Sequence, residues 1–435
     1  SSDVCSSDLD QSATLKTIAK HSERLIRADD IADVLARAMA AMNSGRPGPV
    51  HIEIPTDLME APLSQPRDLP PAEAAPMPDA RLIDQAAGLC TAAVAPVILA
   101  GGGAVWADDA LRALAMRLDA PVVTTTNARG LLAGHALAVP ASPSLPPVRA
   151  LIEASDLVIA VGTQFGPTDY DAYLDGGFKA PPNMIRIDRD PEAAKTSFPA
   201  TVTLCGDSAA VLDRLNAVLA ARPAPSSTGA ARAAETRQAA MAALSPKMQA
   251  MTEVLAVVRD TLPGCTIVGD STQLVYGGNL YWEAAAPRSW FNASTGYGAL
   301  GYGPPAAIGA SLALPDAPVV CLVGDGGFQF CLGALGSATD EASRVIFLVW
   351  NNNGYQEIED HMVSRGITPV GVRPSAPDFR KIAEGYGIPS ERIRLTDGNS
   401  QAALAPGKLD LAPLAAALIR ARAAQGPALI EVMTP

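Results

Sequence analysis

Two short polar motifs have the residue types that bind a divalent cation together with a phosphate. Asp325 lies in Gly324-Asp325-Gly326-Gly327, and Asn352 lies in Asn351-Asn352-Asn353-Gly354, each directly after an apolar stretch. Mg²⁺ takes oxygen ligands and leaves positions for phosphate and water, so a carboxylate, an amide oxygen and a backbone carbonyl form a suitable set. The glycines allow the backbone to approach a phosphate, and a helix that follows presents its N–H groups.

The spacing of the two motifs predicts that they meet in the fold. Asn352 follows Asp325 by 27 residues (352 − 325). This length fits the end of one strand, a crossover helix at about 332–342 and the end of a neighbouring parallel strand. Both side chains are therefore expected at the same carboxyl edge of a sheet, where α/β proteins bind their ligands.

The dipeptide Gly-Asp also follows apolar stretches at Gly206-Asp207 and Gly269-Asp270. An Asp in this position is often the N-cap of a helix, where its carboxylate accepts backbone N–H groups. We adopt this interpretation for Asp207, because Ser208 and a helical pattern follow it. Asp325 differs from both because only it has a partner amide at a fixed distance downstream.

Three consecutive glycines, 101–103, follow the apolar residues 96–100. Glycines between a strand and a helix can allow backbone N–H groups to contact a dinucleotide phosphate. The pattern is not GxGxxG, however, and the next strand runs into Thr124-Thr125-Thr126 without an acidic residue. We therefore favour a tight turn that requires glycine.

The elements that position these motifs alternate between strand and helix. Strands are predicted at 96–100, 121–125, 156–162 and 184–188, and again at 266–269, 319–324, 345–351 and 428–432, with helices such as 108–118 between them. This alternation predicts an α/β fold with doubly wound parallel sheets. The first 60 residues supply one helix, 29–42, and one strand, 50–54, too few to bury a core of their own.

Composition narrows the class of protein. The chain has 435 residues, 48% of them hydrophobic and 18% charged, which suggests about two to three domains. No apolar run approaches the roughly 18–20 residues of a membrane span. A formal charge of −12, without a Lys/Arg cluster, argues against nucleic-acid binding. Six cysteines without a CxxC motif and four scattered histidines give no zinc pattern and suit a reducing cytoplasm.

The two motifs together resemble the thiamine diphosphate motif of a known family. It contains acetolactate synthase, benzoylformate decarboxylase and pyruvate decarboxylase. The likeness covers almost all of 11–435: SGRPGPVHIEIPTDL (44–58) resembles the end of the pyrimidine-binding domain, PVILAGGGA (96–104) and IRIDRDP (185–191) the central domain, and GYGALGYGPPAAIGA (296–310) the start of the diphosphate-binding domain.

This resemblance implies six segments. They are a non-native tail at 1–10, a remnant of the pyrimidine-binding domain at 11–60, a linker at 61–79, a central domain at 80–220, a second linker at 221–245 and a diphosphate- and Mg-binding domain at 246–435. The tail has neither the basic start nor the apolar core of a signal peptide. By ordinary domain size, on the order of 100 residues are expected to be missing before Gln11.

The resemblance also implies a site. Asp325, Asn352 and the Gly354 carbonyl would bind Mg²⁺. The diphosphate and its surroundings would involve Ser271, Thr272, Gln273, Gly324, Gly326, Gly327 and Tyr355. The Gly298 carbonyl would accept a hydrogen bond from the cofactor's 4′-amine, and Leu300 would hold the cofactor in a bent shape. Leucine at this position resembles simple decarboxylases, whereas acetolactate synthases usually have methionine.

Two expected features of the family are not found in the sequence. One is the glutamate that activates the cofactor; Glu53 is no substitute, because it lies in the strand that closes the pyrimidine-binding domain. We therefore predict that the chain alone binds cofactor poorly and turns over little or nothing. The other is the Arg-Phe-Asp-Asp run of acetolactate synthases, which is replaced by Gln164-Phe165-Gly166-Pro167. FAD is therefore not expected.

The acidic stretch 355–360 bears on the substrate, which the family implies to be a small 2-oxo acid. NNNGYQEIEDHMVSRGITPVGV (351–372) resembles decarboxylases of 5-guanidino-2-oxopentanoate, with Glu357 pairing with the cationic tail. The alternative for this stretch is a solvated helix start. An acetolactate synthase-type carboligase and an inactive cofactor-binding fragment are the other functions considered. Family sites form between subunits, which implies a homodimer or homotetramer.

Overall fold

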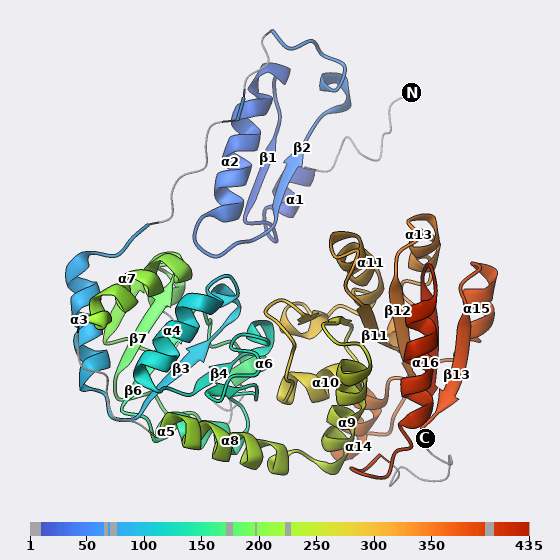
Figure 1. Ribbon diagram of the computed structural model, residues 1–435. Helices are drawn as coiled ribbons and strands as arrows, with labels where there is room; N and C mark the ends of the chain where they lie inside the picture. Colours follow the sequence, from blue (N-terminus) through green and yellow to red (C-terminus); the bar gives the residue numbers. More distant parts are fainter. Residues whose placement is uncertain are drawn as a thin grey trace.

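Two parallel sheets with helices on both faces form most of the chain (Figure 1). The computed structural model describes residues 10–64, 68–69, 76–170, 177–195, 198–221, 228–395 and 404–434. Within these residues each large sheet has six strands, in the orders β5-β4-β3-β6-β7-β8 and β10-β9-β11-β12-β14-β13. The predicted α/β class with doubly wound parallel sheets is confirmed.

The first sheet and its helices lie between residues 80 and 220. Its strands are β3 (Pro96–Ala100), β4 (Val122–Thr124), β5 (Ala138–Val139), β6 (Leu157–Val161), β7 (Met184–Asp188) and β8 (Val202–Cys205). Its helices are α3 (Ala80–Ala92), α4 (Asp108–Leu118), α5 (Pro146–Glu153), α6 (Pro167–Tyr170) and α7 (Ser208–Ala220). Every residue of β3 and β6 is buried, which is why these strands are continuous apolar runs.

The second sheet lies in the C-terminal part. Its strands are β9 (Thr266–Gly269), β10 (Trp290–Asn292), β11 (Val319–Gly324), β12 (Val345–Asn351), β13 (Ser390–Arg394) and β14 (Ala428–Met433). The helices are α9 (Pro246–Thr261), α10 (Gln273–Leu280), α11 (Gly303–Ala313), α12 (Asp325–Phe328), α13 (Ala334–Asp340), α14 (Gln356–Ser364), α15 (Phe379–Gly385) and α16 (Ala412–Ala423). Separate apolar clusters cover its two faces, one with α9 and α16 and the other with α11, α13 and α15.

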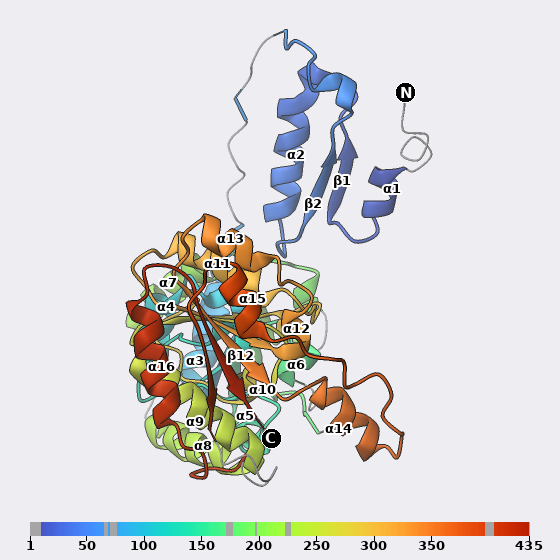
Figure 2. The same cartoon turned by 90° about the vertical axis from the view of Figure 1, so that its right-hand side faces the viewer.

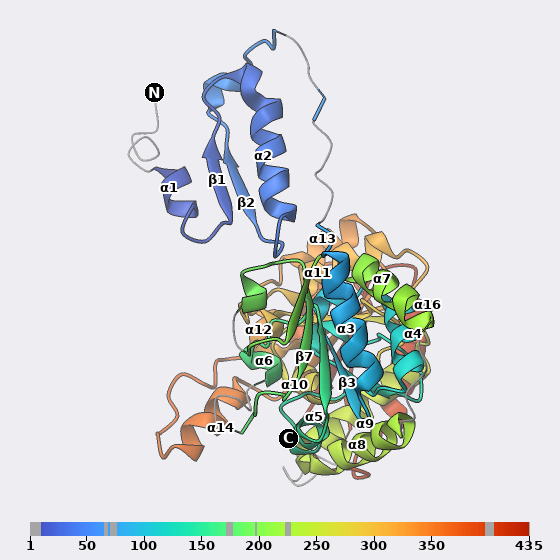
Figure 3. The same cartoon turned by 90° about the vertical axis from the view of Figure 1, so that its left-hand side faces the viewer.

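The N-terminal unit lies to one side of the two large sheets in all three views (Figures 1, 2 and 3) and touches the first of them, where the Arg46 N–H donates to Asp190 Oδ2 at 3.3 Å. It contains α1 (Gln11–Leu15), β1 (His21–Arg24), α2 (Ile31–Asn43) and β2 (Val50–Glu53), and β1 pairs in parallel with β2. Strand β1 was not predicted, because its sequence, His-Ser-Glu-Arg, has no apolar residue. Glu53 ends β2, where its Oε1 lies 3.4 Å from Arg24 Nε.

A helix that the sequence did not predict lies in the second linking segment, 221–245. Helix α8 (Gly229–Ala243) buries Ala233, Thr236 and Ala240, and the two alanines belong to the core under the first sheet. Its alanine-rich sequence alternates with polar residues on every side, so its apolar face is too weak to indicate a helix. Residues 222–227 of this segment lie outside the described residues.

The three glycines after β3 form a tight turn, as predicted. The N–H groups of Gly101 and Gly103 donate to the carbonyls of Val161 and Gly162 at 2.9 and 3.0 Å, so they are not available to a phosphate. A Cβ on Gly101 would lie 2.3 Å from the Gly162 carbonyl oxygen. Only glycine allows the ends of β3 and β6 to approach this closely.

Backbone contacts and a buried arginine join the two large sheets. The Ser142 N–H donates to the Leu280 carbonyl at 2.8 Å, and the Trp282 N–H donates to the Pro140 carbonyl at 3.0 Å. Arg129, which is fully buried, donates to Thr124 Oγ1 at 3.0 Å and to the Asn279 carbonyl at 2.7 Å. Burial lowers the pKa of Arg129 to about 10, and the charge of Asp169 opposes this shift.

No helix among the described residues is long and apolar enough to cross a membrane.

Candidate functional site

The adjacent parallel strands β11 and β12 bring the two polar motifs to one edge of the second sheet. Their register pairs Gly324 with Trp350, so Asp325 and Asn351 follow at the same level. The crossover between the strands contains α13, within the predicted interval 332–342. The expectation that the two motifs meet at one carboxyl edge is confirmed.

Asp325 is a buried carboxylate with one unsatisfied oxygen. Asp325 is the first residue of the short helix α12. The residue is 1% exposed, and its Oδ2 has no hydrogen-bond partner. Burial raises the pKa of Asp325 to about 6, and the N–H groups of Asn352 and Gly354 oppose this shift. A buried carboxylate oxygen without a donor is costly, and a cation bound beside it would remove that cost.

Three oxygens converge at this point. The amide oxygen of Asn352 faces Asp325 Oδ1 at 3.3 Å and the Gly354 carbonyl at 2.8 Å. With the amide turned by 180°, its NH₂ group would donate to both, which is the arrangement expected without a cation. With a cation, the oxygens can face one another as ligands, and their chemistry suits Mg²⁺. Among the described residues there is no cluster of three His, Cys, Asp or Glu side chains that could hold a metal instead.

The loop after β12 requires special backbone conformations to present these oxygens. Asn353 has φ +60° and Gly354 has φ +153°. A Cβ on Gly354 would lie 2.5 Å from the Val372 carbonyl oxygen, which also accepts the Tyr355 N–H at 2.8 Å. The Tyr355 ring covers Gly326 so closely that a Cβ there would lie 2.4 Å from the ring.

The residues after β9 lie beside the same edge. Ser271 Oγ donates to the Gly298 carbonyl at 3.4 Å, and Thr272 Oγ1 would lie 3.2 Å from a Cβ on Gly324. The half-buried Leu300 packs next to Gly327, where a Cβ would lie 3.4 Å from Leu300 Cδ2. The structure therefore brings these implied cofactor contacts together with the Asp325 motif.

Gln273 has a structural contact in addition to its place at the edge. Its Oε1 accepts a hydrogen bond from Trp350 Nε1 at 3.1 Å, and only 3% of the residue is exposed. This contact ties the start of α10 to strand β12. The Oε1 atom of Gln273 therefore already has a hydrogen-bond donor within the protein.

Asp270 organises the site, although the sequence presented it only as a second Gly-Asp turn. It is fully buried, and its Oδ2 accepts the N–H groups of Gly301 and Gly303 at 2.8 and 3.0 Å. These bonds hold the loop containing Gly298 and Leu300 against the end of β9. Asp207, by contrast, caps α7 as predicted, accepting the N–H groups of Ala209 and Ala210.

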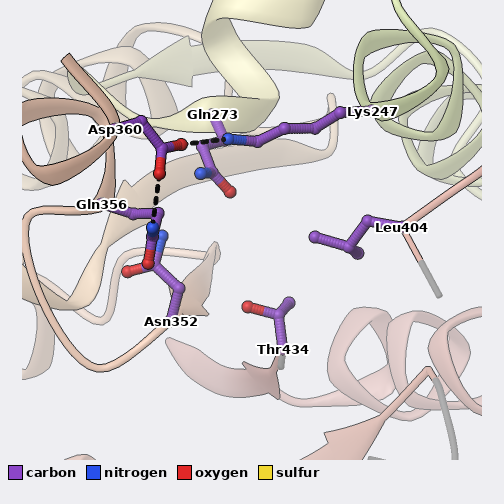
Figure 4. A pocket seen from close by; sticks show the side chains of 7 residues that line it. All are labelled: Lys247, Gln273, Asn352, Gln356, Asp360, Leu404 and Thr434. Carbon is purple, nitrogen blue, oxygen red and sulfur yellow. Dashed lines mark hydrogen bonds and ion pairs between the residues drawn. The ribbon is translucent and has the colours of Figure 1, made fainter. Parts of the chain in front are cut away.

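Glu357 has a protein partner, Lys247, that lies far from it in the sequence. Lys247 of α9 donates to Glu357 Oε1 and to Asp360 Oδ2, both at 3.1 Å. Figure 4 shows Lys247 reaching across a cavity to Asp360. This cavity of about 130 Å³ adjoins Asn352 and is lined by Lys247, Gln273, Asn352, Gln356, Asp360, Leu404 and Thr434.

Comparison with protein families identifies the two sheets. Residues 83–215 match the thiamine pyrophosphate enzyme central domain, and residues 268–432 match the thiamine pyrophosphate enzyme C-terminal TPP binding domain. The chain belongs to the family of enzymes that depend on thiamine pyrophosphate, also called thiamine diphosphate.

Curated relatives include decarboxylases and synthases. A probable 2-ketoarginine decarboxylase of Pseudomonas aeruginosa is 38% identical over 386 residues, which cover 87% of this chain and 68% of the relative. A probable acetolactate synthase large subunit of Methanocaldococcus jannaschii is 28% identical, with 89% of this chain and 69% of the relative covered. The acetolactate synthase isozyme 3 large subunit of Escherichia coli is also 28% identical, with 86% and 68% covered.

Proposed function

We propose that this chain binds thiamine diphosphate through a Mg²⁺ ion held by Asp325, Asn352 and the Gly354 carbonyl. The unsatisfied, buried Asp325 Oδ2 carries the proposal, with the Asn352 side-chain amide and the Gly354 carbonyl close beside the same carboxylate. The test is calorimetric titration of thiamine diphosphate into the chain with and without Mg²⁺. Saturable binding that requires Mg²⁺ is the expected result, and equal binding without Mg²⁺ would contradict it.

The other site residues have roles in holding the cofactor. The backbone at Gly326 and Gly327, with Ser271 and Thr272, would contact the diphosphate. The Gly298 carbonyl would accept a hydrogen bond from the cofactor's 4′-amine, and Leu300 would hold the cofactor in its bent shape. When bound, the cofactor supplies the electron sink for breaking a carbon–carbon bond next to a carbonyl. The chain's own residues bind it, orient it and exclude water.

We further propose that the reaction is decarboxylation of a 2-oxo acid, with 5-guanidino-2-oxopentanoate as the substrate. One relative is named for 2-ketoarginine, which is this compound. The cluster of Glu357, Asp360 and Lys247 supports a cationic substrate, since two carboxylates face a single ammonium group. The guanidinium tail of the substrate would donate two hydrogen bonds to the Glu357 carboxylate. It would bind beside Lys247 or take its place.

The substitution Glu357→Gln tests this assignment. In the chain loaded with thiamine diphosphate and Mg²⁺, we expect affinity for the guanidino oxo acid to fall by roughly 10- to 100-fold, because a charge-assisted hydrogen bond contributes about 1.5–3 kcal/mol. Affinity for pyruvate should not change. Calorimetry measures both affinities.

Glu359→Gln is the matched control on the same helix. Glu359 pairs with Arg373 at 2.7 Å and not with Lys247. This variant should bind the guanidino oxo acid as the wild type does. Equal losses in the two variants, or wild-type preference for pyruvate, would contradict the proposed substrate.

A carboligase is the second candidate, because acetolactate synthase subunits are 28% identical over a similar span. Formation of acetolactate from pyruvate by the loaded chain would favour it. Cofactor binding without either product would favour the third alternative, a cofactor-binding fragment.

A homodimer or homotetramer is proposed for the enzyme, and sedimentation of the loaded protein tests it.

A further inference from the structure

A fully buried carboxylate lies behind the loop that presents the proposed metal ligands. Glu431, on β14, is 0% exposed. Its Oε1 accepts a hydrogen bond from Asn351 Nδ2 at 2.7 Å, and its Oε2 accepts one from Arg392 Nε at 2.6 Å. A buried charge is tolerated only when it is paired and hydrogen-bonded, and both oxygens of Glu431 meet this condition.

Strand register places these three residues in a row across the sheet. Arg392 on β13 pairs directly with Glu431, and Val349 on β12 pairs with Glu431 from the other side. Asn351 lies two residues after Val349, so its side chain points to the same face of the sheet. The Arg392–Glu431–Asn351 chain therefore follows from the order β12-β14-β13.

This chain ends at the metal loop. With its NH₂ group directed to Glu431, the Asn351 amide turns its oxygen to the Asn353 N–H, which donates at 3.0 Å. That bond closes the turn in which Asn353 takes its left-handed conformation, φ +60°. Asn352 and the Gly354 carbonyl flank Asn353, so the turn sets the direction of both oxygens toward Asp325.

We infer that Glu431 is a positioning residue for the metal ligands and acts through Asn351. The inference rests on the proposed metal site. Glu431 orients the Asn351 amide, and the Asn351 amide in turn fixes the geometry of the loop 351–354. Groups behind metal ligands orient them and affect metal affinity in this way.

The carboxylate is needed because both neighbours are donors. Glutamine has one accepting oxygen and one NH₂ group, so in Glu431→Gln the NH₂ group must face a donor, either Arg392 Nε or Asn351 Nδ2. Arg392 is also held by Asp378, whose Oδ1 lies 3.2 Å from Arg392 Nη2. When the glutamine oxygen turns to Arg392, the Asn351 NH₂ group loses its acceptor. The Asn351 amide is then free to rotate and no longer fixes the loop.

The test measures Mn²⁺ affinity of the whole chain in the presence of thiamine diphosphate by electron paramagnetic resonance. Mn²⁺ prefers the same oxygen ligands as Mg²⁺. Glu431→Gln is expected to lower the affinity by roughly 10- to 100-fold. Glu391→Gln is the matched control, because Glu391 on β13 pairs at 2.6 Å with Arg420 of α16, which is not part of the loop 351–354. It should keep wild-type affinity.

Asn351→Ala provides a second variant that leaves the Arg392–Glu431 ion pair in place. It should lose Mn²⁺ affinity to at least the same extent, and the double variant should lose no more than Asn351→Ala alone, because Glu431 acts through Asn351. Circular dichroism and thermal melting show which variants are folded. If Glu431→Gln does not fold, Asn351→Ala decides.

Wild-type affinity in folded Glu431→Gln or in Asn351→Ala would overturn the inference, as would additive losses in the double variant. Failure of the proposed function has a different signature. In that case the Asp325→Asn variant would bind Mn²⁺ as tightly as the wild-type chain, so the binding would not depend on the carboxylate of Asp325.

Discussion

Replacing Asp325 with asparagine is expected to abolish Mg²⁺-dependent binding of thiamine diphosphate. We expect affinity to fall by more than about 100-fold, because loss of a charged metal ligand exceeds the roughly 10- to 100-fold cost of changing a group behind the ligands. Quenching of tryptophan fluorescence can report the binding, since Trp350 precedes Asn351 on β12 and contacts Gln273.

The loss should not come from unfolding. Burial raises the pKa of Asp325 to about 6, so the charged form is less stable in the fold than in water. A neutral asparagine of the same shape removes that cost, and the melting temperature of the cofactor-free variant should be equal to or above that of the wild type.

Asp207→Asn is the control for this experiment. Asp207 also follows a glycine at a strand end, but it caps α7. Asparagine caps helices as well as aspartate does, so both stability and cofactor affinity should remain unchanged. Unaltered cofactor binding in Asp325→Asn would refute the assignment of the metal site.

The second large effect is expected for Arg129→Met, which removes the buried arginine between the two large sheets. The Asn279 carbonyl and Thr124 Oγ1 would lose their donor, and charged hydrogen bonds contribute about 1.5–3 kcal/mol each. We therefore expect the free energy of unfolding to fall by about 3 kcal/mol or more, measured by urea denaturation.

The loss should also reach the cofactor loop. The Asn279 side chain bonds Trp290, Asn292 and Ser294, and the Ala293 carbonyl accepts the Gly298 N–H at 3.0 Å. Affinity for thiamine diphosphate should fall with stability. Arg112→Met is the control, since it breaks a partly buried i,i+4 pair with Asp108 at 3.4 Å, and such helix pairs contribute only about 0.3–0.5 kcal/mol. Equal stability of the two variants would contradict this role of Arg129.

Local patterns in the sequence predicted much of this molecule. The central strands of both sheets are apolar runs, and β9, β11 and β12 have the predicted bounds. The meeting of Asp325 and Asn352 followed from their spacing, because parallel strands with one crossover share an edge. These predictions needed only the order of elements along the chain.

The features that were missed depend on distant partners. Asp270 and Glu431 are single acids whose donors lie on other strands or loops, so nothing near them in sequence marks them as buried. Strands β1 and β13 are polar and short, and their pairing partners are what make them strands. Lys247 lies 110 residues before Glu357, and no periodicity could connect them.

Helix α14 has a consequence for how such enzymes can diverge. None of its residues is buried, and it projects from the second sheet in Figures 2 and 3, joined to the rest by Lys247 and Arg373. Substitutions on exposed positions usually change stability by less than about 0.5 kcal/mol. Mutation can therefore explore new side chains at the exposed positions of this helix, such as Ile358 and the cavity-lining Asp360, with little effect on folding, so a change of substrate can evolve there while the buried residues of the site stay fixed.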